Sequence, residues 1–276
     1  MTRVFVDGNP SEVCCVADGK VSRAPIDGTN TNNIAEYRAV EKARVEEPKK
    51  VVVLLSGGID STVLMYSLIS EYQVYPLTIL CGQRHSKEVI AAWSVCEARG
   101  GWLLERWKYL DLNNLRDILP SALTDTSVAV PTGSYNEEGM SKTVVPNRNM
   151  IFLAIAAGYA EGLGVEYVAY AAHVEDHYLY PDTRPEFVSS VGKTIRLGTG
   201  GKVGLLEPFT YKTKADIIAL GKRLVVPFKL TYSCYRGEDL HCGRCSTCVE
   251  RREAFRKAGV TDPTKYTTGG AKDDCV

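Results

Sequence analysis

The 276-residue sequence lacks a charge excess of either sign, because 33 Lys and Arg residues balance 33 Asp and Glu residues. Proteins that coat DNA or RNA normally carry a basic excess, so this balance argues against that class. Long apolar runs are also missing, since the richest stretch, residues 151–160, falls well short of a membrane span. The first residues do not show the basic and then apolar pattern of a signal peptide. We therefore expect a soluble, cytoplasmic protein with no membrane partner.

Strand-like and helix-like stretches alternate from residue 50 onward. The strands are predicted at residues 51–55, 74–80, 102–107 and 165–171, and the helices at 60–71, 87–98 and 149–163. Residues 120–143 are rich in Pro, Gly, Ser and Thr and predict a long loop. The first strand is a continuous apolar run, as in a parallel strand buried on both faces. The order predicts an α/β fold with a doubly wound, mostly parallel sheet.

Nine cysteines are present, and four of them cluster with the spacing Cys234-x7-Cys242-x2-Cys245-x2-Cys248. Four thiolates can close a tetrahedron around Zn2+, and a closed shell favours a structural metal over a catalytic one. The polar residues between these cysteines argue against the alternative of four neighbours in an apolar core. His241 is a rival ligand, and an iron–sulfur cluster could use the same thiolates. We predict a structural zinc site formed by the four cysteines.

The most informative stretch follows the strand at 51–55 and reads Ser56-Gly57-Gly58-Ile59-Asp60-Ser61-Thr62. Glycines let the backbone approach a ligand, and a helix N-terminus adds a dipole and amide donors, so the stretch predicts an anion site. It is not a Walker A loop, because no lysine follows the glycines in the required register. A plain Gly-Gly turn between a strand and a helix is the simpler alternative.

The Ser-Gly-Gly-Ile-Asp-Ser-Thr string resembles the pyrophosphate loop of the ATP pyrophosphatase superfamily, whose members adenylate a carboxyl or carbonyl oxygen. Four further segments narrow the resemblance to one family of this superfamily: Gly82–His85, Val145–Asn149, Tyr180–Phe187 and Ser233–Cys248. In this order and spacing they are similar to the 7-cyano-7-deazaguanine synthase family, QueC, over residues 50–265. The resemblance implies an adenine nucleotide alpha hydrolase-like fold and a carbon–nitrogen ligase of queuosine biosynthesis.

The reaction that the resemblance implies converts 7-carboxy-7-deazaguanine and ammonia to a nitrile, with Mg2+-ATP, through adenylated carboxylate and amide intermediates. Asp60 and Lys214 are the implied catalytic residues. The implied ATP-binding residues surround the loop: Leu54, Leu55, Ser56, Gly57, Gly58, Ile59, Asp60, Ser61, Thr62, Val63 and Leu64. The implied substrate-binding residues lie near strand ends and the long loop: Arg84, His85, Arg148, Asn149, Tyr180, Asp182 and Arg184.

Several of these residues have structural alternatives. Asp60 could hold a metal or cap its own helix. Lys214 could reach a phosphate, or it could simply begin a helix that Thr213 caps. His173 and His177 lie four residues apart and near Asp176, which suggests a metal site. Nothing completes that set of ligands, so we interpret the histidines as part of a pocket wall or as loop histidines whose hydrogen bonds are satisfied. Thr183 stands where many members of the family have cysteine.

Residues 1–49 differ in sequence pattern from the rest of the chain, which predicts an N-terminal extension. Asp7-Gly8 and residues 32–37 resemble the first strand and first helix of a ribonuclease H-like fold, with a strand at 4–6 and a helix at 34–45. The alternative is a coincidental Asn-Asn cap before a helix. We assign residues 50–230 to the ATP-binding domain and residues 231–276 to a zinc-binding segment of the same domain.

The rival functions are a tRNA-thiolating or amidating relative and a zinc-bearing nucleic-acid-binding module without catalysis. A thiolase is expected to show a nucleophilic cysteine and a basic face, and a binding module is expected to show a basic stripe with aromatics. Neither pattern is evident, so we expect small-molecule partners and no direct contact with nucleic acid. Members of the implied family are often homodimers, which makes a homodimer a further expectation.

Overall fold

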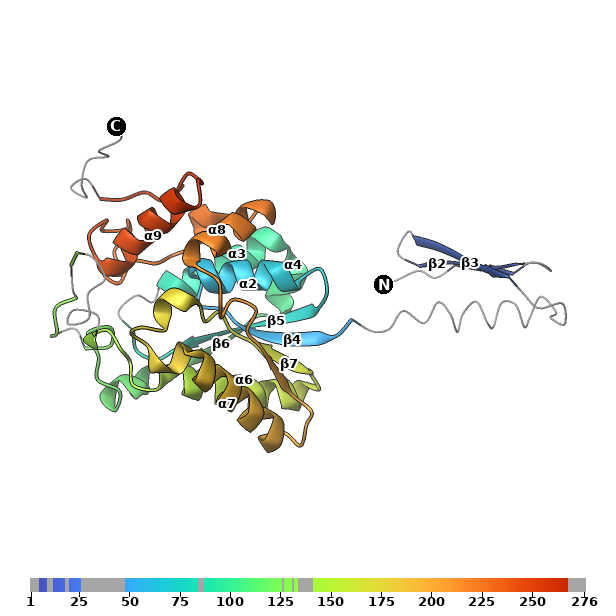
Figure 1. Cartoon of the computed structure of the whole chain (residues 1–276), viewed down its shortest axis with the longest axis horizontal. Coiled ribbons are helices and arrows are strands. Elements are labelled where there is room, and N and C mark those ends of the chain that lie inside the picture. Colours follow the sequence, from blue (N-terminus) through green and yellow to red (C-terminus); the bar gives the residue numbers. More distant parts are fainter. Residues whose placement is uncertain are drawn as a thin grey trace. The chain divides into compact units, whose positions relative to one another are not determined.

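The computed structural model describes residues 48–267, apart from 84–86, 126, 131 and 134–140, and the backbone of three N-terminal strands. The chain divides into two units, Met1–Pro48 and Lys49–Val276 (Figure 1). In the first unit, strands β1 (Phe5–Gly8), β2 (Glu12–Ala17) and β3 (Lys20–Pro25) form an antiparallel sheet in that order. The helix predicted at 34–45 lies outside the described residues.

The second unit is built around a five-stranded sheet with the order β6-β5-β4-β7-β8, in which every neighbouring pair is parallel. Its strands are β4 (Lys50–Leu54), β5 (Gln73–Leu80), β6 (Lys108–Asp111), β7 (Tyr167–Ala169) and β8 (Gly204–Leu206). This confirms the predicted doubly wound α/β fold. The chain builds outward from β4 on one side and then returns to β7 on the other. The reversal leaves a crevice beyond the carboxyl ends of β4 and β7, where ligands bind in such sheets.

Helices cover both faces of this sheet (Figure 1). On one face lie α2 (Ile59–Leu68), α3 (Lys87–Arg99), α4 (Gly101–Arg106), α8 (Lys214–Arg223) and α9 (Ser246–Lys257). On the other lie α6 (Arg148–Leu163) and α7 (Pro185–Gly198). Short 3-10 turns are η1 (Asn113–Asp117), η2 (Val174–Asp176), η3 (Pro181–Thr183) and η4 (Phe228–Leu230). Among the helices described, none has the length and apolar character needed to cross a membrane.

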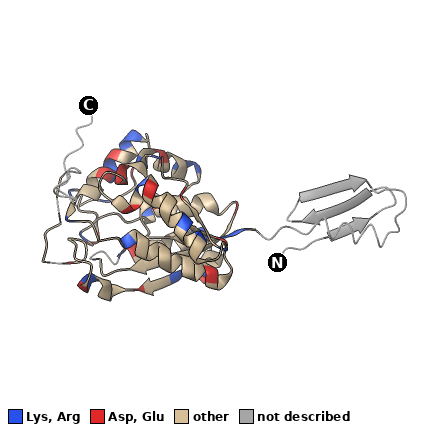
Figure 2. Ribbon diagram, turned by 60° about the horizontal axis from the view of Figure 1, so that its bottom comes forward, with Lys and Arg blue, Asp and Glu red and all other residues tan. Residues whose placement is uncertain are grey.

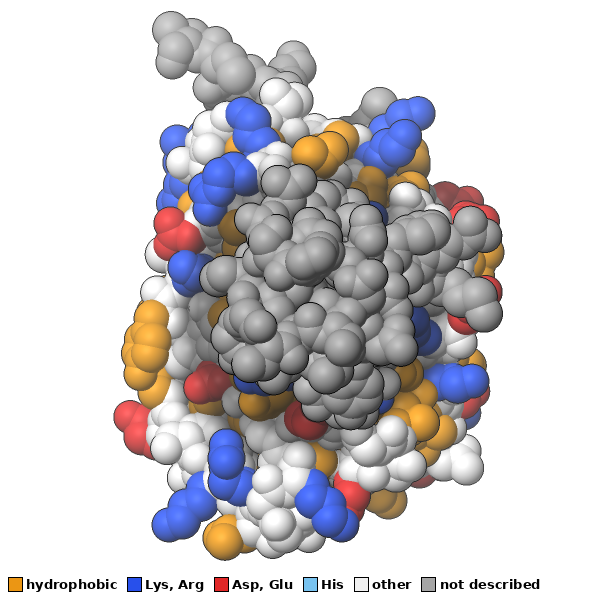
Figure 3. Space-filling view, turned by 90° about the vertical axis from the view of Figure 1, so that its right-hand side faces the viewer, with side chains coloured by type: hydrophobic (Ala, Val, Ile, Leu, Met, Phe, Trp, Pro, Cys, Tyr) orange, Lys and Arg blue, Asp and Glu red, His pale blue; other side chains and the backbone are white. Residues whose placement is uncertain are grey.

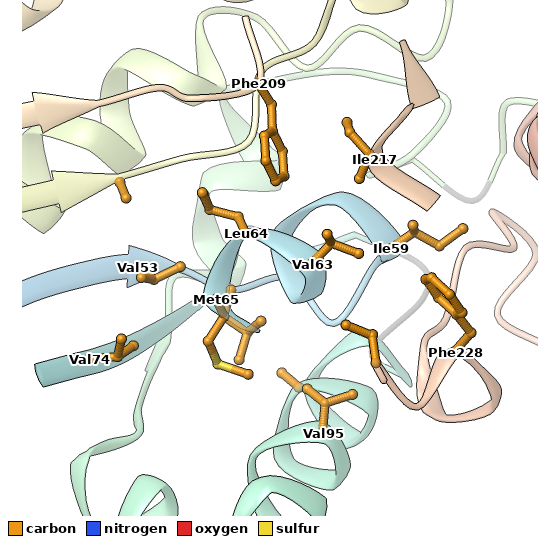
Figure 4. Close-up of a cluster of buried hydrophobic side chains, with 14 of the residues drawn as sticks. Val53, Ile59, Val63, Leu64, Met65, Val74, Val95, Phe209, Ile217 and Phe228 are labelled. Carbon is orange, nitrogen blue, oxygen red and sulfur yellow. The ribbon is translucent and has the colours of Figure 1, made fainter. Parts of the chain in front are cut away.

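The apolar run of β4 is explained by burial on both faces. Val51 and Val53 belong to the cluster under α2, α3 and α8, together with residues such as Val63 and Ile217 (Figure 4). Val52 belongs to the cluster on the opposite face, under α6 and α7. Side chains alternate across a strand, so a strand covered on both faces needs apolar residues at every position. This burial fixes the end of β4, and with it the start of the predicted phosphate loop.

The strand predicted at 102–107 is wrong, because these residues form helix α4 and the strand β6 begins only at Lys108. Gly100, at φ 141°, separates α3 from α4 in a conformation that favours glycine. Within α4, the guanidinium of Arg106 lies over the Trp102 ring at 5.4 Å, one helical turn away. A short apolar run is typical of a buried helix as well as of a buried strand, which is why this pattern predicted the wrong element.

Charged residues of both signs are interspersed along the described helices and strands of the second unit (Figure 2). Figure 3 shows the same mixture among the coloured side chains visible on one face. Exposed pairs such as Lys202–Glu161, at 2.9 Å, and Lys257–Glu253, at 3.1 Å, are part of this mixture. The balanced composition is therefore also a local balance in these parts of the surface.

Candidate active site and metal centre

The predicted phosphate loop joins β4 to α2, and its hydroxyl groups are held by one another. The Ser56 hydroxyl lies 3.0 Å from that of Ser61, and it accepts a hydrogen bond from the Gly58 amide at 3.2 Å. Gly57 has φ +83°, which turns the backbone sharply before α2 begins. Gly58 is the N-cap residue of α2, and no side-chain hydrogen bond caps this helix. The loop is thus preorganised, with the positive end of the helix dipole left to a ligand.

Asp60, in the first turn of α2, does not cap its helix but faces a half-buried cluster of charged residues. Asp60 Oδ2 lies 3.6 Å from both Lys214 Nζ and His173 Nε2. Lys214 Nζ also donates a 2.7 Å hydrogen bond to Glu250 Oε2, and His173 Nε2 lies 3.2 Å from Asp176 Oδ2. Four distant segments of the chain therefore converge on one point beside the loop.

The charges in this cluster set one another's protonation. Burial opposes the ionisation of Asp60, but Lys214 and His173 outweigh it and hold the pKa of Asp60 far below its ordinary value. Burial likewise disfavours the Lys214 ammonium, yet Asp60 and Glu250 raise its pKa well above the ordinary value. Burial lowers the pKa of His173, whereas Asp176 and Asp60 raise it to about 9. Lys214 is therefore a fixed positive charge next to the phosphate loop.

Lys214 begins α8, and the capping expected from the sequence is present as well. The Thr213 hydroxyl accepts a hydrogen bond from the Asp216 amide, and the Asp216 carboxylate accepts one from the Thr213 amide. This capping box fixes the start of the helix. The two interpretations of Lys214 are compatible, because the cap fixes its backbone while its side chain reaches the cluster.

A cavity of about 270 Å³ opens beside the loop at the carboxyl ends of β4 and β7. Its lining includes Ser56, Gly58 and Asp60 from the loop and Lys214 from α8. The lining also includes residues from α3, α6, α9 and the segments after β5, β7 and η4, among them Gln83, Glu88, Arg148, Asn149, Phe152, Tyr170, Asp176, Tyr180, Ser233, Tyr235 and Glu250. The cavity thus joins the predicted phosphate loop to a wall with aromatic and hydrogen-bonding groups, as ligand sites commonly do.

Arg148 is the cationic residue of α6 that faces this cavity. The preceding Asn147 has φ 51°, a left-handed conformation that Asn tolerates better than most residues, and it sets the start of α6. Burial disfavours the Arg148 charge, but the neighbouring Cys81 and Glu88 outweigh it and raise its pKa. A guanidinium in a cavity wall can bind a carboxylate with two parallel hydrogen bonds.

The four predicted zinc ligands form a compact buried group of thiols. Their sulfur atoms lie within 4.8 Å of one another, and two of the sulfur–sulfur distances are 4.0 Å. A tetrahedral site with Zn–S bonds of about 2.3 Å places its sulfurs about 3.8 Å apart, so the group fits such a metal. The Cys245 amide donates to Cys242 Sγ at 3.2 Å, which would stabilise a thiolate. His241 Nε2 instead accepts a hydrogen bond from the Ser233 amide, so this ring nitrogen is occupied elsewhere.

Comparison with known proteins places the chain in one family. The family described as Queuosine biosynthesis protein QueC matches residues 50–259. The chain belongs to the QueC family. It is 46% identical over 218 residues to the 7-cyano-7-deazaguanine synthase of Caldicellulosiruptor saccharolyticus, covering 79% of this chain and 95% of that relative. Over 79% of its length it is 44% identical to the enzyme of the same name from Methanoregula boonei, with 99% of that relative covered.

The predicted family is thereby confirmed, and the relatives' shared name makes it a family of enzymes. Within the QueC-like region, the catalytic residues expected from the sequence, Asp60 and Lys214, lie together at the cavity. Arg148, Asn149 and Tyr180 line it too, as do the loop residues Leu54, Leu55, Ser56, Gly58, Ile59 and Ser61. Other residues expected to bind ATP are buried beneath the loop, with no exposed surface at Thr62, Val63 and Leu64.

The remaining residues expected to bind substrate fall elsewhere. Arg84 and His85 lie outside the described residues. Asp182 and Arg184 are described but do not line the cavity. Asp182 Oδ2 accepts a 3.0 Å hydrogen bond from the Asn149 amide, and Arg184 Nε donates to the His177 carbonyl at 2.8 Å. Asp182 therefore holds the first turn of α6, which carries two residues of the lining.

Glu250 is the residue of this QueC-family site that the sequence did not reveal. It lies two residues after Cys248 on α9, and only the packing of α9 on α8 brings it to Lys214. Asp176 was noted only as a neighbour of the two histidines, yet it lines the cavity next to the phosphate loop. The sequence of α9 carries charged residues along its length, so no local signal singles out Glu250.

Proposed function

We propose that this chain is an ATP-dependent ligase that converts 7-carboxy-7-deazaguanine and ammonia to 7-cyano-7-deazaguanine. The observation that carries the proposal is one cavity that joins the preorganised loop, the Asp60–Lys214 pair and Arg148 in a chain of the QueC family. The names of the relatives supply the product, the resemblance of the sequence implies the substrate, and the loop would supply a place for the phosphates of ATP.

In this proposal the reaction consists of two adenylations. A carboxylate oxygen attacks the α-phosphorus of ATP, pyrophosphate leaves, and ammonia then displaces AMP to give the amide with release of a proton. The amide oxygen attacks a second ATP in the same way. Loss of AMP and of the amide protons leaves the carbon–nitrogen triple bond. Each oxygen of the original carboxylate thus departs on a molecule of AMP.

The loop and Lys214 would bind the triphosphate. The amides at the start of α2 and the Gly-Gly turn favour an anion, and the buried Lys214 ammonium would stabilise negative charge that develops as pyrophosphate leaves. Asp60 keeps Lys214 charged and oriented. Bound Mg2+ would supply further neutralisation of the phosphates, and Asp60 is the loop carboxylate nearest to them.

At the other wall, Arg148 would bind the substrate carboxylate, and Tyr180 would lie along the deazaguanine ring. Asp182 and Arg184 would act from behind the lining by holding Asn149 and the His177 carbonyl. We assign zinc to the four thiols in a structural role, since the group has no open position. Residues 1–49 lie outside the part of the chain that matches the family, and we propose that they are an appended, ribonuclease H-like fragment.

The test is mass spectrometry of 7-carboxy-7-deazaguanine incubated with the full chain, Mg2+-ATP and ammonium. We expect the nitrile mass with the wild type and a loss of rate of about a hundredfold or more with Asp60→Asn. Asp117→Asn is the matched control, since this carboxylate is exposed and pairs only loosely with Arg116 at 3.8 Å. Accumulation of the amide without nitrile would show that the product assignment is wrong. No turnover by a folded, zinc-loaded chain would refute the proposed reaction.

A further inference from the structure

Three side chains next to the phosphate loop meet in a way that the roles given so far do not explain. One ligand atom each from His173, Asp176 and Glu250 lies within 4.8 Å of the others. His173 comes from the segment after β7, Asp176 from η2 and Glu250 from α9. Asp176 and Glu250 line the cavity, so the point where the three meet can be reached from it.

His173 provides a second, independent observation. Its side chain is 1% exposed, and neither of its ring nitrogens makes a hydrogen bond. Nε2 lies 3.2 Å from Asp176 Oδ2 without hydrogen-bond geometry, and the Asp60 Oδ1 atom nearby is also buried without a partner. Leaving a buried polar atom without a hydrogen-bond partner is destabilising, so these atoms call for a ligand.

The spacing of these atoms suits a metal ion. With metal–oxygen bonds of about 2.1 Å, adjacent ligands of an octahedral site lie about 3.0 Å apart. The 3.2 Å between His173 Nε2 and Asp176 Oδ2 is close to this value. The two atoms do not form a hydrogen bond at this distance, so hydrogen bonding does not explain their approach.

The charge of the cluster points the same way. Four carboxylates, those of Asp60, Glu175, Asp176 and Glu250, lie near His173 or Lys214, and Lys214 is the one fixed cation among the ion pairs described there. A metal ion binds only the neutral imidazole, so the cation would displace the proton of His173. The four carboxylates then exceed Lys214 by three charges, in a place mostly shielded from water. A divalent cation would offset most of that excess.

We propose that His173, Asp176 and Glu250 bind a divalent cation of the manganese or magnesium type, next to Asp60 and Lys214. Carboxylate oxygens favour these hard ions, and the single imidazole favours manganese over magnesium. The cation needs no nucleotide to bind. Its use in holding ATP phosphates rests on the proposed function, whereas its binding does not.

The test uses the full chain with zinc loaded, without nucleotide or substrate, and Mn2+ as the probe. Electron paramagnetic resonance titration should show a single tight Mn2+ site in the wild type. Glu250→Gln and His173→Gln should each weaken binding at least tenfold, at unchanged zinc content. Glu253→Gln is the matched control, because Glu253 lies on the same helix but pairs with Lys257 at the surface. It should bind Mn2+ as the wild type does.

A second measurement uses the wild type alone, so its result does not depend on whether the variants fold. Pulsed electron paramagnetic resonance should detect coupling of the bound Mn2+ to an imidazole nitrogen. Absence of a tight Mn2+ site, or a site without nitrogen coupling, would overturn the proposal. A chain that binds Mn2+ in this way but makes no nitrile would refute the proposed reaction and leave the metal site standing.

Discussion

Gly57→Ala is a direct test of how the phosphate loop is built. A Cβ at this position would overlap the carbonyl oxygen of Glu88 and lie 2.6 Å from the amide nitrogen of Ala92. Both atoms belong to the backbone of α3, which cannot move without displacing the helix. The Gly57 backbone is also left-handed, at φ +83°, and its carbonyl accepts a hydrogen bond from the Tyr232 amide at 3.0 Å.

The size of the effect follows from these two costs. A left-handed conformation costs an L-residue about 1–2 kcal/mol. Forcing a methyl group into a packed contact typically costs about 1–3 kcal/mol. We therefore expect Gly57→Ala to lower the free energy of unfolding by about 2–5 kcal/mol.

Gly58→Ala is the matched control, one residue further along. Gly58 has φ −74°, and a Cβ there would meet the Ser56 hydroxyl at 3.3 Å and the Tyr232 carbonyl oxygen at 3.7 Å. Because alanine is a poorer N-cap residue than glycine, we expect Gly58→Ala to lower the free energy of unfolding by about 1 kcal/mol or less.

The assay for both variants is urea unfolding followed by tryptophan fluorescence. The three tryptophans of the sequence, Trp93, Trp102 and Trp107, all lie in or just after α3 and α4, so they report on the element that Gly57 contacts. Equal stabilities of the two alanine variants would refute the reasoning, because they would show that α3 does not confine the loop.

Three further predictions concern the C-terminal elements. Arg251→Met should destabilise the chain by about 3–5 kcal/mol in urea unfolding, since it leaves the Asp262 carboxylate and three other acceptors of the buried guanidinium without their partner; a loss under about 1 kcal/mol would contradict this. Thr213→Ala removes the hydroxyl that caps α8 and should lower the free energy of unfolding by about 1 kcal/mol. Thr213→Ser keeps a hydroxyl and should lose much less stability. Equal losses of stability in the two variants would show that the hydroxyl does not cap the helix. Removal of metal from the four-cysteine group by a chelator should lower the thermal unfolding midpoint and make all four thiols reactive to a thiol reagent, and an unchanged midpoint would argue against a structural metal.

The phosphate loop and the four-cysteine group could be predicted because their signals are local. The run from Val51 to Leu55 with two glycines after it fixes a strand, a turn and a helix start within a few residues. The spacing of the cysteines likewise places several ligands in one short segment. Such features depend little on how distant elements pack.

The rest of the site depends on tertiary packing. Glu250 meets Lys214 across 36 residues of sequence, only because α9 packs on α8. Asp182 was expected at the substrate, but the geometry of η3 turns it to the Asn149 amide 33 residues earlier. The apolar run at 102–107 gave the wrong element, since Gly100 restarts the helix there. For Glu250 and Asp182 the decisive contact joins segments whose proximity no local pattern encodes, whereas at 102–107 the local apolar pattern itself was ambiguous.

We propose that the chain adenylates the substrate carboxylate at the phosphate loop, and the fate of the carboxylate oxygens tests this most directly. The measurement is mass spectrometry of the nucleotides formed from 7-carboxy-7-deazaguanine whose carboxylate carries a heavy oxygen isotope at both positions. We predict AMP with one heavy oxygen per molecule and two such molecules for each nitrile formed. AMP without the label, or label found in ADP or inorganic phosphate, would contradict adenylation of the carboxylate.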